Sequence, residues 1–348
     1  MSSASPFGGG TFAADFRPPP GLANRHVQTL LPRLLPLQAL SQTAEQVELS
    51  DGDFLELAWA VPAPRSSSAP IFILFHGLEG SFDSPYARQL LHAAAGRGWR
   101  AVLMHFRGCG KRANRLPRAY HSGETGDARQ VLTQIRERYP EAPIVAAGVS
   151  LGGNMLVKLV AEAPMSLSGA IAINAPLDLA ASADALNRGG ARLYQRYLLT
   201  ELRRKVAGQL ARQAMPLRLD VDDLNALDTF WAYDDAVTAP LHGFASASDY
   251  YQRASAGPLI DTLTTPTLIL HAADDPFMPA ELFQRLPCPA SAVRIEIARH
   301  GGHVGYIEAH RGRLRSWLAR RVLAQLEDWV PMANGSAIPT VADGQTEK

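Results

Sequence analysis

The stretch IVAAGVSLGGNMLVKLVAE, residues 144–162, carries three local signals that together decide the fold. It begins with a short apolar run typical of a buried parallel strand and ends in a helical pattern. Between the two lies Gly148-Val149-Ser150-Leu151-Gly152, a Gly-X-Ser-X-Gly pattern. A sharp turn from strand to helix needs small residues on both sides of the serine, because side chains there would collide with backbone. The stretch therefore predicts a strand, a strained turn that exposes Ser150, and a helix.

Strand-like and helical segments alternate on both sides of this stretch. The alternation predicts an α/β fold with a mostly parallel, doubly wound sheet and right-handed crossovers. A hairpin signal around Asp51-Gly52 predicts an antiparallel N-terminal edge. The strand-like runs begin at Ile71, Ala101, Ile144, Gly169, Thr267 and Val293, and the helical patterns cover 85–97, 126–139, 153–162, 280–286 and 310–329.

The interval from Asn174 to Thr267 is too long for one crossover helix and predicts an insertion. Within it, apolar residues recur every four positions, which is the stripe of an amphipathic helix: Leu198, Leu202, Val206 and Leu210. We interpret residues 178–257 as an inserted helical cap that divides the core into 21–177 and 258–330. The biased ends, 1–20 and 331–348, are expected to be flexible.

The insertion is also polarised in charge. Residues 188–218 hold eight basic side chains and one acidic side chain, whereas residues 220–235 hold six acidic side chains and no Lys or Arg. Two interpretations stay open. The stretches are solvated faces that pair with each other, or the basic helix attracts an anionic substrate or a lipid surface.

An unassisted serine hydroxyl is a weak nucleophile, so a nucleophilic Ser150 requires a histidine that accepts its proton and an acid that orients the histidine. After a strained elbow the expected chain order is serine, acid, histidine. The segment TLILHAADDPFMP places an acidic pair beyond a buried strand. We choose Asp275 over Asp274, because Pro276 biases Asp275 toward an extended conformation. The alternative is a turn in which both carboxylates cap backbone N–H groups.

The final strand-like run leads into RHGGHVGY, a glycine-flanked loop with two histidines. We choose His303 as the base, because Gly301 and Gly302 free the preceding backbone to bend and Val304 can shield the ring. His300, beside an arginine, is expected to be more exposed. A metal site at the two histidines lacks a third ligand or a His-Glu-X-X-His pattern, so we expect no metal.

A tetrahedral intermediate needs two N–H donors for its oxyanion. The residue after the nucleophile, Leu151, supplies one, and a turn after an early strand usually supplies the other. The segment IFILFHGLEGS ends such a strand, so Leu78 is the second candidate. Leu78, Ser150, Leu151, Asp275 and His303 thus occur in the chain order that is expected when the serine lies on a strand-to-helix elbow.

The amino-acid composition argues against several other classes of protein. With 34 basic and 33 acidic residues the formal charge is +1, which argues against a dedicated nucleic-acid binder. The two cysteines, Cys109 and Cys288, form no paired spacing, which fits a reducing compartment. We find no signal peptide and no apolar run long enough to span a membrane. We therefore expect a cytoplasmic protein without integral membrane contact and without cofactors.

With these residues identified, the chain resembles the α/β-hydrolase superfamily and, within it, the YheT-like and EMB8-like esterase branch, also called AB hydrolase family 4. The resemblance covers about residues 15–325. It is carried by FRPPPGLANRHVQTLLP (16–32), FHGLEGS (75–81), MHFRGCGKRANRLPRAYHSGETGD (104–127), GVSLGG, ADDPF and HGGHVG. It implies an α/β-hydrolase fold with Ser150 as nucleophile, Asp275 as orienting acid and His303 as base. Lys111 departs from the pattern, which bears on substrate details only.

The sequence and the resemblance together predict a serine esterase that cleaves carboxylic esters through an acyl-enzyme. The apolar cap favours a small-molecule ester with an acyl or lipid-like chain. Three alternatives stay open: an acyltransferase with the same triad, a binding protein with a silent site, and peripheral docking of the basic helix on anionic membranes. The sequence does not decide the oligomeric state.

Overall fold

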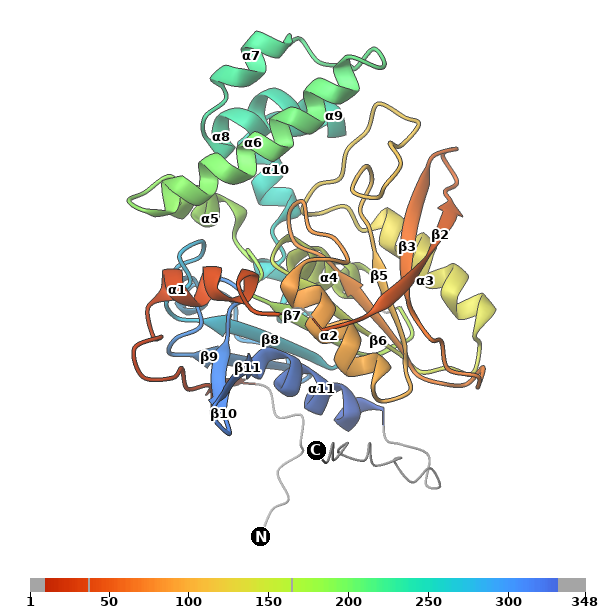
Figure 1. The fold of residues 1–348 in the computed structure, drawn as a ribbon. Coiled ribbons are helices and arrows are strands. Elements are labelled where there is room, and N and C mark those ends of the chain that lie inside the picture. Colours follow the sequence, from red (N-terminus) through yellow and green to blue (C-terminus); the bar gives the residue numbers. More distant parts are fainter. Residues whose placement is uncertain (1–9, 37, 164, 331–348) are drawn as a thin grey trace, which may run out of the picture.

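One mixed sheet of nine strands runs through the part of the chain that the computed structural model describes, residues 10–36, 38–163 and 165–330 (Figure 1). Its strand order is β1-β9-β8-β7-β6-β4-β5-β3-β2. The strands are β1 (Gly10–Ala13), β2 (Ser41–Glu48), β3 (Phe54–Val61), β4 (Ile71–Phe75), β5 (Arg100–Met104), β6 (Ile144–Val149), β7 (Leu167–Ile173), β8 (Thr267–Ala272) and β9 (Val293–Ala298).

The sheet is parallel except at one edge. Strands β5, β4, β6, β7, β8, β9 and β1 run parallel, whereas β3 is antiparallel to both β2 and β5. All residues of β4, β5, β6 and β8 are buried, which explains their continuous apolar runs. The expected mostly parallel sheet with an antiparallel N-terminal edge is therefore confirmed.

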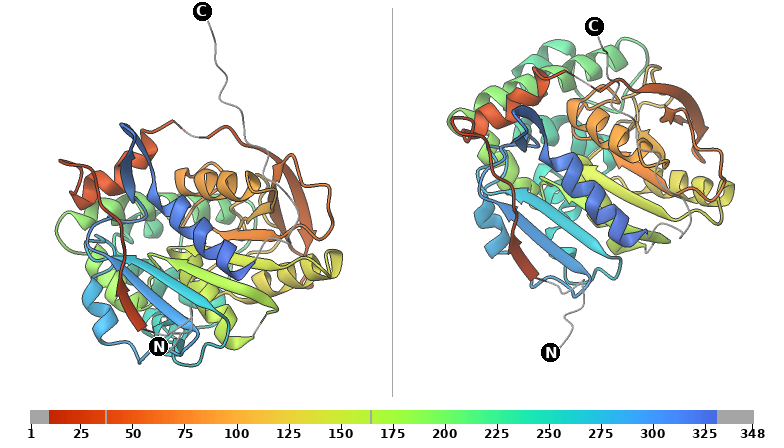
Figure 2. Two further views of the ribbon diagram at one scale, coloured as in Figure 1. Left: turned by 90° about the horizontal axis from the view of Figure 1, so that it is seen from below. Right: turned by 60° about the horizontal axis from the view of Figure 1, so that its bottom comes forward.

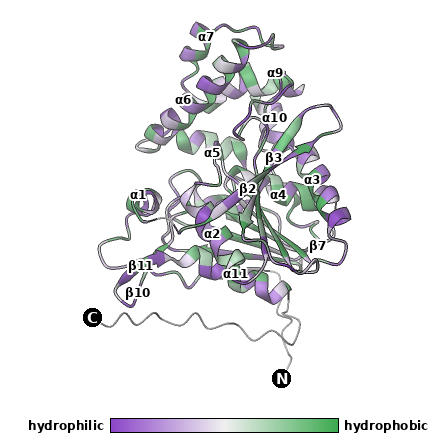
Figure 3. Ribbon diagram, turned by 45° about the vertical axis from the view of Figure 1, so that its right-hand side comes forward, coloured by the Kyte–Doolittle hydropathy of each residue, from purple (hydrophilic) through white to green (hydrophobic). Residues whose placement is uncertain are grey.

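Helices cover both faces of the sheet, and the hydropathy colouring of Figure 3 shows the strands as the apolar layer between them. On one face α2 (Pro85–Ala95) and α11 (Trp317–Trp329) share an apolar cluster, and Figure 2 shows α11 lying across this face. On the other face α3 (Gly126–Arg138) and α4 (Leu151–Glu162) pack against the opposite sides of the same strands. This is the doubly wound arrangement expected from the alternation.

The long interval between β7 and β8 forms a helical layer, drawn at the top of Figure 1. Its stripe lies as expected: Leu202 and Val206 are buried, and they face the cavity described below. Its helices are α5 (Leu179–Leu186), α6 (Ala191–Leu210), α7 (Val221–Ala226), α8 (Phe230–Tyr233), a π-helical turn at Asp234–Thr238, α9 (Ala239–His242) and α10 (Ala247–Ala254).

The structure differs from the sequence expectations near both ends of the chain. Residues 1–9 and 331–348 lie outside the described residues, but Gly10–Ala13, expected in a flexible segment, forms β1 and pairs with β9. The helix expected over 310–329 begins only at Trp317. The residues before it form the hairpin β10 (Ile307–His310) and β11 (Arg313–Ser316).

The hairpin has a local cause. Arg311 and Gly312 both have positive φ, of 49° and 75°, as a two-residue hairpin turn of type I′ requires. The helical pattern at 280–286 is likewise reduced to a 3₁₀ segment, Ala280–Gln284.

Among the described residues, no helix combines the length and apolar character that crossing a bilayer requires.

Candidate active site

Ser150 lies at the turn between β6 and α4, with φ 52° and ψ −121°. A side chain at Gly148 would collide with the backbone of Gly152, and a Cβ at Gly152 would lie 2.5 Å from the carbonyl oxygen of His76. The two glycines are therefore dictated by close backbone approach on both sides of the serine. The Ser150 N–H donates to the Ile173 carbonyl at 2.8 Å, which fixes the turn to the neighbouring strand.

Ser150, His303 and Asp275 form a chain of contacts. Nε2 of His303 lies 3.1 Å from Oγ of Ser150, and Nδ1 of His303 lies 2.9 Å from Oδ2 of Asp275. The side chain of Asp275 is completely buried and that of His303 is 11% exposed. An ionised carboxylate only accepts hydrogen bonds, so the imidazole donates from Nδ1 and its Nε2 is free to accept the serine proton.

Burial alone would raise the pKa of Asp275, but the charge of His303 and its hydrogen bond hold that pKa below its usual value. The Phe277 N–H also donates to Oδ1 at 2.7 Å. Asp275 is therefore an anion near neutral pH. Such an anion stabilises the positive charge that His303 acquires when it takes a proton.

The neighbouring acid and histidine, Asp274 and His300, are not in this chain of contacts. Oδ1 of Asp274 accepts the N–H of Gly302 at 2.9 Å, and Oδ2 lies 3.5 Å from Nδ1 of His300. Asp274 thus shapes the loop that carries His303. The structure brings Asp275 and His303 to Ser150, and it brings neither Asp274 nor His300 there.

Asn174 is a residue of the site that sequence reasoning missed. Its side-chain N–H donates to Oδ2 of Asp275 at 2.6 Å, and its Oδ1 accepts the hydroxyl hydrogen of Tyr306 at 2.8 Å. Its backbone has φ 47°, which asparagine tolerates better than most residues. The available signal was its place at the carboxyl end of β7, where sites of open α/β sheets form.

The histidine loop is held by α1 (Arg25–Leu30), a second contribution that the motifs did not reveal. Oγ1 of Thr29 accepts the His303 N–H at 2.9 Å. Gln28 is fully buried, and its Oε1 accepts the Ile307 N–H at 2.8 Å. Gly302 has φ 55°, and a Cβ there would lie 2.6 Å from Oγ1 of Thr29. The N-terminal helix and this glycine therefore fit each other closely.

Phe277 covers the imidazole. Its ring is stacked on that of His303, with centroids 4.0 Å apart and planes 15° from parallel, and Tyr194 of α6 packs on Phe277 at 5.0 Å. This aromatic wall limits the rotation of the imidazole and shields it from water. The expected shield, Val304, is itself buried in the loop at 9% exposure.

The two candidate oxyanion donors lie in turns beside Ser150. The loop of Leu78 is close, because a Cβ on Gly77 would lie 3.2 Å from Cβ of Ser150. Within the described part of the chain, the backbone N–H groups of Leu78 and Leu151 have no hydrogen-bond partner. Leu151 is the first residue of α4, where the helix dipole favours negative charge.

His76 fixes the turn of Gly77 and Leu78 through hydrogen bonds of both ring nitrogens. It is fully buried, and burial lowers its pKa to about 3, so the ring is neutral. Nε2 accepts the Phe106 N–H at 3.1 Å, which places the proton on Nδ1, and Nδ1 donates to the Gly77 carbonyl at 2.6 Å. The carbonyl before Leu78 is thereby fixed.

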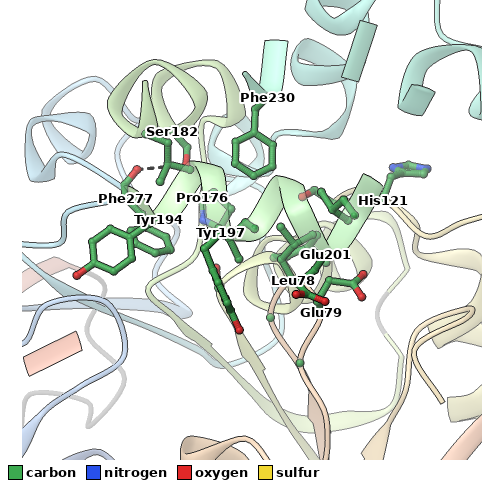
Figure 4. A pocket seen from close by; sticks show the side chains of 18 of the residues that line it. Leu78, Glu79, His121, Pro176, Ser182, Tyr194, Tyr197, Glu201, Phe230 and Phe277 are labelled. Carbon is green, nitrogen blue, oxygen red and sulfur yellow. Dashed lines mark hydrogen bonds between the residues drawn. The ribbon is translucent and has the colours of Figure 1, made fainter. Parts of the chain in front are cut away.

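A cavity of about 650 Å³ lies between the sheet and the helices α5, α6, α8, α9 and α10, and both Ser150 and His303 line it. Its walls are mostly apolar, and Leu198, Leu202, Val206, Phe230 and Tyr233 contribute to them. In Figure 4, Tyr194 and Phe277 lie in one part of the cavity and His121 in another, with Leu78 and Glu79 between them in the view. The candidate nucleophile therefore faces a mostly apolar cavity that the helices between β7 and β8 partly cover.

One cluster among the described residues approaches the spacing of metal ligands: His121, Glu124 and His242. Nδ1 of His121 accepts the Gly123 N–H at 3.1 Å, so its Nε2 carries the proton. Oε2 of Glu124 accepts from Arg118 at 2.6 Å. Nε2 of His121 thus carries a proton, and Oε2 of Glu124 is bound by an arginine. This donor set does not fit a metal ion.

Comparisons with known proteins identify the family and the fold of this chain. The family model described as "alpha/beta hydrolase fold" matches residues 70–310. The protein YheT of Escherichia coli (strain K12) is 40% identical over 321 residues, which cover 91% of this chain and 93% of YheT. The human protein "Phospholipase ABHD3" is 26% identical over 305 residues, 84% of this chain and 74% of that protein.

A solved structure of the Pyrococcus furiosus esterase Pf2001 superposes with a TM-score of 0.54 at 14% identity, covering 90% of this chain and 97% of that one, and it supports the fold alone. The match to YheT confirms the resemblance expected from the sequence. The extent of the family match and the identity to YheT lead to one conclusion: this chain belongs to the α/β-hydrolase family and has its esterase and lipase type of fold.

Proposed function

We propose that this protein is a serine esterase that hydrolyses carboxylic esters with an apolar acyl chain. The observation that carries the proposal is the contact chain from Oγ of Ser150 through His303 to Oδ2 of Asp275. A serine, an imidazole and a buried carboxylate in this order form the arrangement that activates a hydroxyl toward a carbonyl carbon.

The reaction proceeds in two halves. Nε2 of His303 accepts the hydroxyl proton as Oγ of Ser150 bonds to the ester carbon, and the resulting oxyanion receives hydrogen bonds from the N–H groups of Leu78 and Leu151. The imidazolium then gives its proton to the departing alkoxide, which leaves as an alcohol. Water, deprotonated by the same imidazole, attacks the acyl-enzyme, and Ser150 regains its proton as the acid is released.

The apolar cavity supports an acyl or lipid-like substrate. Its volume of about 650 Å³ is in the usual range for small-molecule sites. Two apolar side chains of α6 that line it, Leu193 and Tyr197, are 74% and 51% exposed, so apolar surface continues outward from the cavity. The relatedness to a protein named as a phospholipase points to the same class of substrate.

The test compares the parent protein with Ser150→Ala on p-nitrophenyl esters of graded chain length. We expect the variant to lose at least about 10⁴-fold in kcat and to keep its thermal stability. We also expect a fluorophosphonate to label the parent at Ser150 and to leave the variant unlabelled. An active Ser150→Ala variant, or a parent without hydrolysis and without labelling, would contradict the proposal.

A further inference from the structure

Glu79 occupies an unusual position in the loop beside Ser150. It follows Leu78 directly, and its φ of 52° lies in the left-handed region that favours glycine. The Gly80 N–H donates to the Gly77 carbonyl at 2.9 Å, so the four residues 77–80 form a tight turn with Glu79 in its third position. Because this backbone position favours glycine, the contacts of the Glu79 side chain must offset the strain of its backbone.

That side chain and its backbone are bound by one tyrosine. The hydroxyl of Tyr120 accepts the Glu79 N–H at 2.9 Å and donates to Oε1 of Glu79 at 2.7 Å. On the other side of the turn, the Gly77 N–H donates to the hydroxyl of Tyr86 at 2.9 Å. The N–H groups before and after Leu78 are therefore both fixed by tyrosine hydroxyls, and the Leu78 N–H between them has no partner among the described residues.

The third partner of Glu79 comes from α6. Nζ of Lys205 donates to Oε1 of Glu79 at 2.7 Å and to Sγ of Cys109 at 3.1 Å, and it lies 5.3 Å from the ring centroid of Tyr120. The side chains of Lys205 and Glu79 are only 21% and 17% exposed. This ion pair is thus shielded from water, and it joins the inserted helices to the turn of Leu78.

The protonation states in this cluster are consistent with a single ion pair. Burial raises the pKa of Cys109 to about 12, so its thiol stays protonated. Burial likewise raises the pKa of Tyr120, and its hydroxyl remains a donor. Lys205 therefore pairs with the Glu79 carboxylate alone among these side chains, and removal of either partner leaves a charge in a partly buried place.

We propose that Glu79 and Lys205 are positioning residues that align the Leu78 N–H with the oxyanion when α6 is seated over the cavity. This inference rests on the proposed esterase function of Ser150. Leu202 and Val206 flank Lys205 on α6 and line the cavity. An acyl chain that packs on these side chains therefore contacts the same helix that holds Glu79, which links occupation of the cavity to stabilisation of the oxyanion.

The test measures kcat and KM separately for Glu79→Gln, Lys205→Met and the double variant with a p-nitrophenyl ester. We expect each single variant to lose about 10- to 100-fold in kcat, less than the loss of a whole oxyanion donor, with KM changed less than about threefold. The double variant should be no more than about threefold slower than the slower single variant, because both substitutions remove one contact. Lys205→Arg, which keeps a charged donor, should recover most of the rate.

Two further variants separate positioning from folding. Glu79→Gly suits the left-handed backbone and removes the carboxylate, so it should remain folded at the assay temperature and be as slow as Glu79→Gln. Arg196→Met removes an exposed cation from the same helix and should keep the parental kcat. A Glu79→Gly or Lys205→Met variant within about twofold of Arg196→Met, or losses that multiply in the double variant, would overturn the inference.

These outcomes differ from failure of the proposed function. A parent protein that neither hydrolyses esters nor is labelled at Ser150 contradicts the esterase proposal itself. An active parent with unchanged Glu79 and Lys205 variants contradicts only the link between α6 and the Leu78 turn.

Discussion

The side-chain amide of Asn174 donates to Asp275 through a 2.6 Å hydrogen bond, on the same carboxylate oxygen that faces His303. Oδ2 of Asp275 therefore has two donors, and Tyr306 fixes the amide by donating to its Oδ1 at 2.8 Å. Because an amide has distinct donor and acceptor ends, this order prevents Asn174 from turning its oxygen toward the carboxylate. Asn174 and Tyr306 thus help to set the orientation of the acid.

Replacement of Asn174 by Ala removes a hydrogen bond to a charged group, for which about 1.5 kcal/mol is a typical value. We expect a loss of about tenfold in kcat with little change in KM, measured on a short-chain ester. A variant with parental kcat would contradict the positioning role of Asn174. Urea unfolding of the same variant separates this effect from a loss of stability.

Asp275 and Asp274 offer a matched pair of substitutions in adjacent positions. Asp275→Asn replaces the acceptor of the His303 N–H by an amide and favours the wrong tautomer, so we expect kcat to fall by about 10⁴-fold. Asp274→Asn keeps an acceptor for the Gly302 N–H, and we expect its kcat to fall by less than about tenfold. Equal losses in the two variants would contradict the assignment of Asp275.

Buried neutral histidines predict how stability depends on pH. Because the folded pKa of His76 is about 3 against an ordinary value of 6.5, its contribution is complete above pH 6.5 and is lost as pH falls toward 3. Over this window the unfolded chain binds a proton that the folded chain does not, which lowers the free energy of unfolding by about 1.4 kcal/mol per pH unit. Urea unfolding of His76→Gln between pH 7 and pH 4 should show a slope shallower by this amount, and an unchanged slope would contradict it.

The inserted helices should set the preferred acyl length. Leu202 is buried and lines the cavity, so Leu202→Trp fills part of the space available to a long chain. We expect kcat/KM for a long-chain p-nitrophenyl ester to fall by about tenfold or more, whereas the acetyl ester changes little. Arg196→Trp, at an exposed position of the same helix that does not line the cavity, is the control and should keep the parental preference. Parallel losses for all chain lengths would contradict a chain-binding role of the cavity.

Gln28→Ala tests the link between α1 and the histidine loop. The substitution leaves the buried Ile307 N–H without its acceptor, and we expect a loss of about 1–3 kcal/mol in the free energy of unfolding. Gln252→Ala, at an exposed position of α10, should change it by less than about 0.5 kcal/mol. A stability of Gln28→Ala equal to that of the control would argue against this link.

The sequence predicted those parts of the molecule that leave local marks. The turn of Ser150 is flanked by glycines, the acid follows a buried strand and precedes a proline, and the histidine lies beyond paired glycines. Each mark arises because a backbone must bend or approach another backbone closely at that point. Hydrophobic periodicity likewise predicted α6, whose stripe faces the cavity.

Contacts between distant segments left no such mark. Gln28 meets Ile307 across 279 positions, and Lys205 meets Glu79 across 126. An isolated polar residue has the same appearance in a sequence whether it faces solvent or completes such a contact. The helix predicted over 310–316 was wrong for the opposite reason, because a local pattern was present but misleading. Leu314 lies three and four positions before Trp317 and Leu318, as in a helix, and only the turn at Arg311-Gly312 shows that this segment forms a hairpin.

The Thr29 contact has a consequence for biosynthesis. Thr29 leaves the ribosome early, whereas the His303 N–H that it receives emerges only after most of the chain has been translated. A nascent fragment that already contains Ser150 still lacks His303. Until His303 has been translated, Thr29 of α1 cannot make its contact with the histidine loop. The proposed site therefore cannot be complete in a translation product that ends before His303, and its histidine loop is held in place only after the first and last portions of the polypeptide have packed together.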